Sequence, residues 1–161
     1  MTATDTDLAA DPADAADRTP ADRLLLTAFR RWVVGWRDCR IEEWVAVWTA
    51  FHDALPRDRA ANAVRALEGL FSTIGLNARR TLHHHQPRCP CVGPDEERLL
   101  ALIGAAGGAD PRTAEALAGA LVRPEALAET LSRAHALAEA IRPLRAAGTQ
   151  SENGNRSGLL H

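Results

Sequence analysis

Residues 41–55 read IEEWVAVWTAFHDAL, and this stretch sets the fold class. Its apolar residues recur three and four positions apart, which is the spacing of one face of an amphipathic α-helix. Pro56 follows at once and predicts that the helix ends there, because a proline ring disrupts a continuing helix. The residues on the predicted face are Ile41, Trp44, Val45, Trp48, Phe51, His52 and Leu55.

The segment before this stretch has the signals of a helix start. Thr19 offers a capping hydroxyl, Pro20 suits the first helical position, and Asp22 sits where the acid of a capping box is expected. The helix is predicted to end near Arg37. Its apolar side chains at helical spacing are Leu25, Phe29, Trp32, Val33 and Trp36.

Four more helices are predicted after Pro56. The first of these is expected to continue through Arg79 and Arg80, whose charges suit the negative end of a helix dipole. The last should kink or end at Pro143. No segment alternates with the period of two that a strand requires. The chain is therefore predicted to be all-α, with about six helices in a bundle or an irregular orthogonal array. The three remaining helix starts are near Pro94, Pro111 and Pro124.

Composition divides the 161 residues into one domain and two tails. Residues 1–18 contain five aspartates and one large apolar residue, Leu8, so a disordered acidic arm is predicted there. Residues 148–161 are polar and rich in glycine, and they are predicted to form a disordered tail. Residues 19–147 form the predicted helical domain, and a chain with 46% hydrophobic residues can bury one ordinary core.

Charge and cysteine content favour a soluble cytoplasmic protein. The net charge is −2, and outside the acidic arm the chain is only mildly basic, which makes a nucleic-acid partner unlikely. Three cysteines are an odd number, and the acidic start does not resemble a secretion signal. No apolar stretch approaches the roughly 20 residues that cross a bilayer, so no membrane partner is expected.

A segment rich in histidine and cysteine, HHHQPRCPC at residues 83–91, holds five potential metal ligands within nine residues. Pro90 favours an extended Cys89, and alternate residues of an extended chain point to the same side. Two thiolates and two imidazoles suit a transition metal, with zinc as the best match. The sequence therefore predicts a metal site whose ligands are His83, His85, Cys89 and Cys91.

This metal site requires a chain that folds back, because an extended segment of nine residues covers roughly 26 Å. A turn at Gln86 and Pro87 would meet the requirement, or a further ligand would come from elsewhere. Two alternatives stay open, namely a solvated loop with incidental thiols and a site of thiol redox or haem-type chemistry. The candidates for additional ligands include His84, His52 and Cys39.

Four tryptophans lie at helical spacing on two consecutive helices, so a helical hairpin would bring them together. One interpretation is an aromatic cluster inside the core. The other is an apolar groove for a partner helix or a flat ligand, flanked by Arg30 and Arg31. The four residues are Trp32, Trp36, Trp44 and Trp48.

Two functional hypotheses follow. The first is a small cytoplasmic regulatory or adaptor protein whose His/Cys loop binds zinc in a structural or sensory role. The second is a metal-free helical module that binds a protein or a nucleic acid through its tryptophan cluster and arginine surface. The protein partner is not identified, and a second copy of the chain is one candidate. No catalytic motif is present, so an enzyme is the less favoured reading.

Overall fold

The computed structural model describes residues 18–108 and 110–156, and it describes side chains up to residue 147. The predicted acidic arm therefore lies outside the described residues except for Arg18, which forms an ion pair with Glu97. The predicted tail begins inside the last helix, whose backbone is described to Arg156. Residues 157–161 lie outside the described part of the chain.

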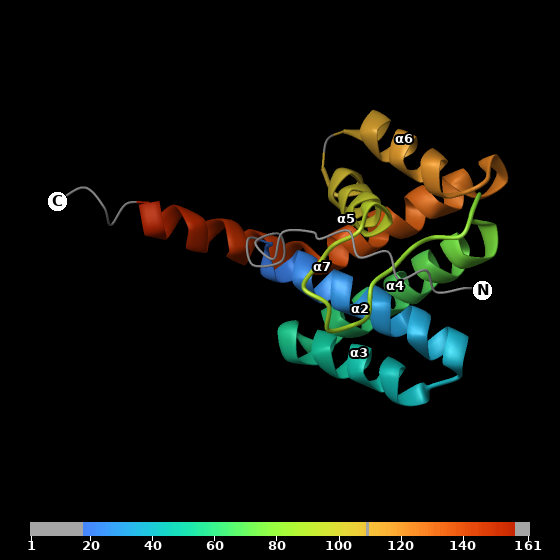
Figure 1. The fold of residues 1–161 in the computed structure, drawn as a ribbon. Helices are drawn as coiled ribbons and strands as arrows, with labels where there is room; N and C mark the ends of the chain where they lie inside the picture. Colours follow the sequence, from blue (N-terminus) through green and yellow to red (C-terminus); the bar gives the residue numbers. More distant parts are fainter. Residues whose placement is uncertain (1–17, 109, 157–161) are drawn as a thin grey trace.

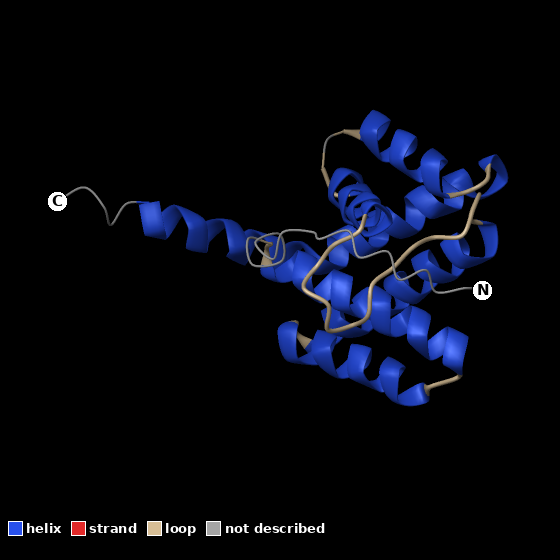
Figure 2. Cartoon of the chain, in the orientation of Figure 1, coloured by secondary structure: helices blue, strands red, loops and turns tan. Residues whose placement is uncertain are grey.

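The described residues form six α-helices and one short 3₁₀ turn, with no strand among them (Figures 1 and 2). This confirms the predicted all-α fold. No helix of this part of the chain is long and apolar enough to cross a membrane. The elements are α2 (Pro20–Asp38), α3 (Ile41–Ala54), α4 (Arg57–Asn77), α5 (Pro94–Ala106), α6 (Pro111–Leu121), η1 (Pro124–Ala126) and α7 (Leu127–Arg156).

Capping groups and prolines set most helix starts where the sequence predicts them. The Thr19 hydroxyl accepts a hydrogen bond from the Asp22 backbone N–H at 3.1 Å, and Pro20 is the first residue of α2. Asp110 caps α6 in the same way. Pro143, in contrast, lies inside α7 without ending it.

The predicted continuation of α4 through Arg79 and Arg80 is wrong, because α4 ends at Asn77. The chain pairs there with the end of α6 instead of adding another helical turn. The Arg79 N–H donates to the Leu121 carbonyl at 3.0 Å, and the Arg123 N–H donates to the Asn77 carbonyl at 2.9 Å. These hydrogen bonds satisfy backbone groups that a longer helix would have satisfied internally.

One hydrophobic core joins the two halves of the chain. From the first half, Phe29 and Phe71 meet edge to face with ring centroids 5.1 Å apart. Leu102 and Leu137 from the second half are fully buried in the same cluster. The helices on both sides of the His/Cys segment therefore stabilise each other.

The apolar face predicted for α3 is divided between the core and the surface. Phe51 and Leu55 are buried together with Val47, which is 3% exposed. Ile41 and Val45 point away from the core and are 69% and 57% exposed. The reason is that α3 has apolar residues on more than one side, and the core covers only the side that carries Val47, Phe51 and Leu55.

Residues 78–93, which we call the strap, connect α4 to α5 without forming a helix. In Figure 1 this yellow-green segment crosses over α2 before it enters α5. The strap contains every residue of the predicted metal site.

Candidate functional site

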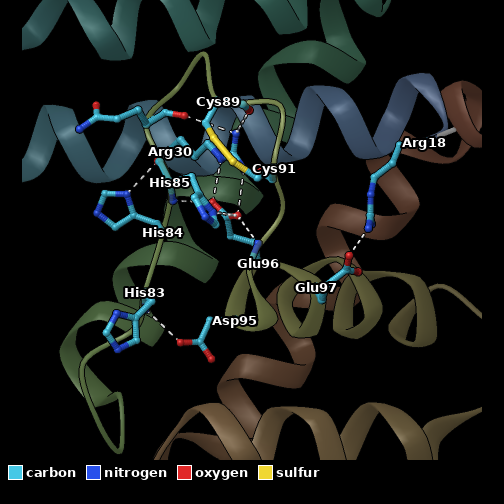
Figure 3. Close-up of polar contacts among 12 residues, drawn as sticks. Arg18, Arg30, His83, His84, His85, Cys89, Cys91, Asp95, Glu96 and Glu97 are labelled. Atoms are coloured by element: carbon cyan, nitrogen blue, oxygen red, sulfur yellow. Dashed lines mark hydrogen bonds and ion pairs between the residues drawn. A yellow bond between two sulfur atoms is a disulfide. The ribbon is translucent and has the colours of Figure 1, made fainter. Parts of the chain in front are cut away.

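The strap is held by a buried ion pair between α2 and α5 (Figure 3). Arg30 of α2 is 2% exposed, and Glu96 in the first turn of α5 is fully buried. Arg30 Nε donates to Glu96 Oε1 at 2.7 Å, and Arg30 Nη2 donates to Glu96 Oε2 at 2.9 Å. Two parallel hydrogen bonds of this kind fix both side chains in direction as well as distance.

The same guanidinium holds the backbone of the strap. Arg30 Nη1 donates to the carbonyls of Gln86 at 3.3 Å and Cys89 at 2.7 Å, and Nη2 donates to the carbonyl of Cys91 at 2.5 Å. Arg30 was expected on a partner-binding surface, but the structure places it under the strap. One sequence signal points to this position, because Arg30 falls on the helical stripe that also carries Leu26 and Val33.

Two consecutive carboxylates at the start of α5 accept hydrogen bonds from the strap. Glu96 accepts from the backbone N–H groups of His85 at 2.9 Å and Gly93 at 2.8 Å. Asp95 accepts from the His83 N–H at 2.9 Å, and it also pairs with Arg80 at 2.5 Å. The positive end of the α5 dipole favours both negative charges.

These contacts lower the pKa of both carboxyls. Hydrogen bonding from Arg80 is the main cause for Asp95, and it holds the pKa at about 2. Burial by itself raises the pKa of Glu96. The hydrogen bonds from Arg30, Gly93 and His85 outweigh burial and bring the pKa of Glu96 to about 2. Both groups are therefore ionised at neutral pH, and the strap rests on two fixed negative charges.

The three histidines of the strap point to different partners. His85 Nδ1 lies 2.9 Å from Glu96 Oε2, and because a carboxylate only accepts, this nitrogen carries the proton. His84 Nδ1 donates to the His85 carbonyl at 3.1 Å, and its ring stands edge-on to Phe29. His83 is exposed. The backbone tethers at Asp95 and Glu96 account for this arrangement, because they fix the strap without bringing the rings together.

Cys89 and Cys91 form a disulfide. The predicted approach of these two sulfurs is thus present, but the imidazoles of His83 and His85 do not join them. Within the described residues, no group of three or more His, Cys, Asp or Glu side chains is placed to hold a metal ion. The zinc site stays a prediction.

The additional candidate ligands outside the strap lie elsewhere in the fold. Cys39 is exposed in the link between α2 and α3, where its φ of 54° ends α2 in a left-handed conformation. His52 is exposed on α3 and stacks on Trp48, with ring centroids 5.3 Å apart. Neither residue forms a metal-ligand group with Cys89 and Cys91 in the described part of the chain.

Three of the four tryptophans, Trp32, Trp36 and Trp44, lie together, whereas the ring contact of Trp48 is with His52. Trp32 is buried and lies beside Trp36, with ring centroids 5.4 Å apart. Trp44 Nε1 donates weakly to the Trp32 carbonyl at 3.4 Å, and it reaches this position because Gly35 has no side chain there. Of the four indoles, one is buried in the core and three are exposed by about two fifths to one half.

A groove of about 460 Å³ opens beside these indoles, between α2, α3 and α4. Arg31, which was expected to flank it, instead pairs with Glu43 at 2.7 Å. The charged groups that do line the groove are Arg65 and Glu68 of α4, and residue spacing did not point to either of them. The full lining is Trp32, Trp36, Trp44, Arg65, Glu68, Gly69, Ser72 and Leu76.

A second, smaller cavity of about 310 Å³ lies where the strap turns near α2 and α3. Its lining contains three arginines and one carboxylate, that of Glu43. Sequence reasoning missed it because its residues come from three segments that only the fold brings together. They are Arg31, Val34, Arg40, Glu43, Gln86, Pro87 and Arg88.

No protein-family model, curated protein or solved structure matches the chain.

Proposed function

We propose that the protein is a helical protein-interaction module, with an adaptor or regulatory role, that assembles with a second copy of itself. The binding surface would be the Trp face, a set of six large apolar side chains that the fold leaves exposed. This exposure is the observation that carries the proposal. The Trp face consists of Trp36, Ile41, Trp44, Val45, Trp48 and Leu76.

The size of the Trp face suits a dimer. Large apolar side chains present on the order of 150–250 Å² each when fully exposed, so the exposed fractions of these six amount to roughly 600 Å². A stable interface buries about 800 Å² per partner, including its polar rim. The largest apolar patch on a typical monomer is about 300–600 Å² and is often functional, so the Trp face is at the upper end of that range.

The shape of the Trp face supports a second copy as the occupant. Ile41, Val45 and Trp48 form a ridge along α3, and the groove lined by Trp36 and Leu76 lies beside it. A two-fold interface needs a ridge and a groove on the same surface, because each copy then inserts its ridge into the other's groove.

Charge at the groove is compatible with the same arrangement. Arg65 and Glu68 lie three residues apart on α4 and have opposite signs. In a two-fold dimer, each can approach its opposite on the partner. Pairs at the rim of an interface contribute to orientation more than to affinity.

Sedimentation velocity of the full chain over a wide range of concentrations tests the proposal. We expect a monomer–dimer equilibrium, and we expect Val45→Glu to shift it to monomer, because it places a charge in an apolar interface. Ala116→Glu, on the exposed side of α6, is the matched control and should leave the equilibrium unchanged. A wild-type chain that stays monomeric throughout, or equal effects of both variants, would contradict the proposal.

A zinc-binding role for the strap is a second proposal, favoured by the adjacent sulfurs of Cys89 and Cys91 and by the tautomer of His85. In the neutral imidazole, the proton on Nδ1 faces Glu96 and leaves Nε2 able to accept a metal, as in many metal-ligating histidines. We expect zinc in reduced, untagged protein purified without chelator, and its loss in the Cys89→Ser, Cys91→Ser double variant. Mass spectrometry for metals measures this, and absence of zinc from the reduced wild-type protein would refute the role.

A further inference from the structure

The Cys89–Cys91 pair carries an inference that is independent of the Trp face. We infer that these two cysteines are a thiol–disulfide exchange site whose substrate is a small anionic thiol. Four features of the strap support it, namely the short loop that the disulfide closes, the fixed backbone, the partial exposure of both cysteines and the positive charge of Arg88.

The disulfide does not connect elements of the fold. It joins residues only two positions apart, so its ring contains no helix and it constrains very little of the unfolded chain. The connection between strap and helices is made instead by Arg30 and Glu96. Opening the disulfide therefore leaves the helix contacts in place, which a structural cross-link would not allow.

The backbone that carries the two sulfurs is fixed independently of them. Arg30 holds the carbonyls of both cysteines. The Cys89 N–H donates to the Gln86 carbonyl at 3.0 Å, which closes a tight turn, and Pro90 restricts the residue between the cysteines. Both thiols should stay close together after reduction, so that the bond can form again without a search through other conformations.

Both cysteines are half-buried, whereas Cys39 is exposed. Part of each cysteine is therefore open to solvent, which gives a small thiol a way to approach the pair.

Arg88, the residue before Cys89, carries a positive charge next to the disulfide, whereas the charge of Arg30 is paired with Glu96. Arg88 also lines the cavity of about 310 Å³, whose lining has three guanidinium groups against Glu43 and includes neither cysteine. Arg31 and Arg40 each pair with Glu43, at 2.7 and 3.4 Å. Arg88 has no carboxylate within ion-pair distance among the described residues. A cavity of this size can hold a molecule as large as a short peptide. Its arginines favour a thiol that carries a carboxylate over a cationic thiol.

The exchange proceeds in two steps that balance. The thiolate of the small thiol attacks one sulfur of the pair, the Cys89–Cys91 bond breaks, a mixed disulfide forms and the other cysteine leaves as a thiolate. A second small thiolate then attacks the sulfur of the bound small molecule, which releases a small-molecule disulfide and the second cysteine thiolate. Two electrons pass from two small thiols to the protein, and the two protons of those thiols end on Cys89 and Cys91.

Equilibration with glutathione tests the site. The full chain is held in buffers of varied ratio of glutathione to glutathione disulfide, free thiols are trapped with a maleimide mass tag, and intact mass is measured. We expect Cys89 and Cys91 to gain or lose tags together as the ratio changes, while Cys39 is tagged under reducing conditions in every series. Cys39→Ser should leave the transition unchanged. Tags on both Cys89 and Cys91 even in glutathione disulfide alone would overturn the proposal.

The substrate class has its own test, the rate of reduction by glutathione compared with the cationic thiol cysteamine. Arg88→Gln should slow reduction by glutathione several-fold without slowing reduction by cysteamine. Arg112 is exposed on α6, and Arg112→Gln is the control, which should affect neither rate. Equal effects of Arg88→Gln on both thiols, or no effect on glutathione, would show that the anionic class is wrong.

Discussion

Arg30 is the residue on which the strap depends most. It is buried, and every nitrogen of its guanidinium donates a hydrogen bond to the strap or to Glu96. It belongs to α2, which the strap crosses. Arg30 contributes to stability because it keeps the buried charge of Glu96 paired. A buried ion pair adds little compared with an apolar pair of the same volume, but the loss of one partner leaves the other charge stranded.

Arg30→Met should therefore lower the free energy of unfolding by about 3–5 kcal/mol. Arg31→Met, one residue further along, is the matched control. Arg31 also pairs with a glutamate, but it is partly exposed, so its loss should cost only about 0–1 kcal/mol. Urea denaturation followed by circular dichroism measures both values. A cost for Arg30→Met as small as that for Arg31→Met would mean that the strap is not held as described.

Acid should destabilise the protein through Asp95 and Glu96. Their pKa values are about 2 in the folded chain, against ordinary values of 3.8 and 4.5, so the unfolded chain takes up protons first as the pH falls. The stabilisation is complete above about pH 5 and is lost between there and about pH 2. Asp95→Asn should reduce the slope of unfolding free energy against pH, and exposed Asp53→Asn should not. Identical slopes for Asp95→Asn and the wild type would contradict the assignment.

Residue spacing predicted that the Cys89 and Cys91 sulfurs lie on one side of the chain, but the extended segment assumed for that prediction is absent. The chain bends at Pro90, and the two Cα atoms are 5.4 Å apart, against roughly 6.6 Å in a strand. The same rule extended to His83 and His85 did not describe the structure, since their backbone N–H groups are bound by carboxylates of α5. Such tethers join parts of the chain that spacing alone does not relate.

At the scale of elements, α3 is a helix whose buried side could not be predicted from the spacing of its apolar residues. Its sequence offers apolar residues to two sides, and periodicity cannot tell which side the other helices will cover. The buried side is chosen by packing with α2 and α4, which places Val47 inside and Val45 outside. The ends of most helices were predictable from capping residues and prolines. The end of α4 was not, because it is fixed by hydrogen bonds to residues 121–123.

Val45 and Val47 give a matched pair for testing the orientation of α3. Val47→Ala should lower the free energy of unfolding by about 2 kcal/mol, from lost burial plus the cavity left behind. Val45→Ala should change it by no more than about 0.5 kcal/mol under conditions where the chain is monomeric. Thermal or urea unfolding of the two variants distinguishes the sides, and the reverse order of effects would show that α3 is rotated.

At the scale of the whole molecule, contacts between the two halves recur along the length of the chain. The end of α4 pairs with the end of α6 through Ala78 and Val122, and Arg145 of α7 pairs with Asp22 of α2 at 3.5 Å. Together with the shared core and the strap, these contacts link α2–α4 to α5–α7 at several separate places. The halves should therefore not unfold independently, although the second half has shorter helices and no tryptophan.

The distribution of aromatic residues makes this last expectation measurable. The chain has no tyrosine, and its four tryptophans all fall within residues 32–48, so intrinsic fluorescence reports on α2, α3 and the part of α4 that packs against them. Far-ultraviolet circular dichroism reports on every helix. If the halves share one core, the two signals should follow a single urea transition with the same midpoint and slope. Both must be recorded at one protein concentration, because self-association through the Trp face would itself raise the midpoint. A loss of helical signal that precedes the fluorescence change would show that α5–α7 unfold first. The strap would then connect two cooperative units, α2–α4 and α5–α7, and the chain would not unfold as a single unit.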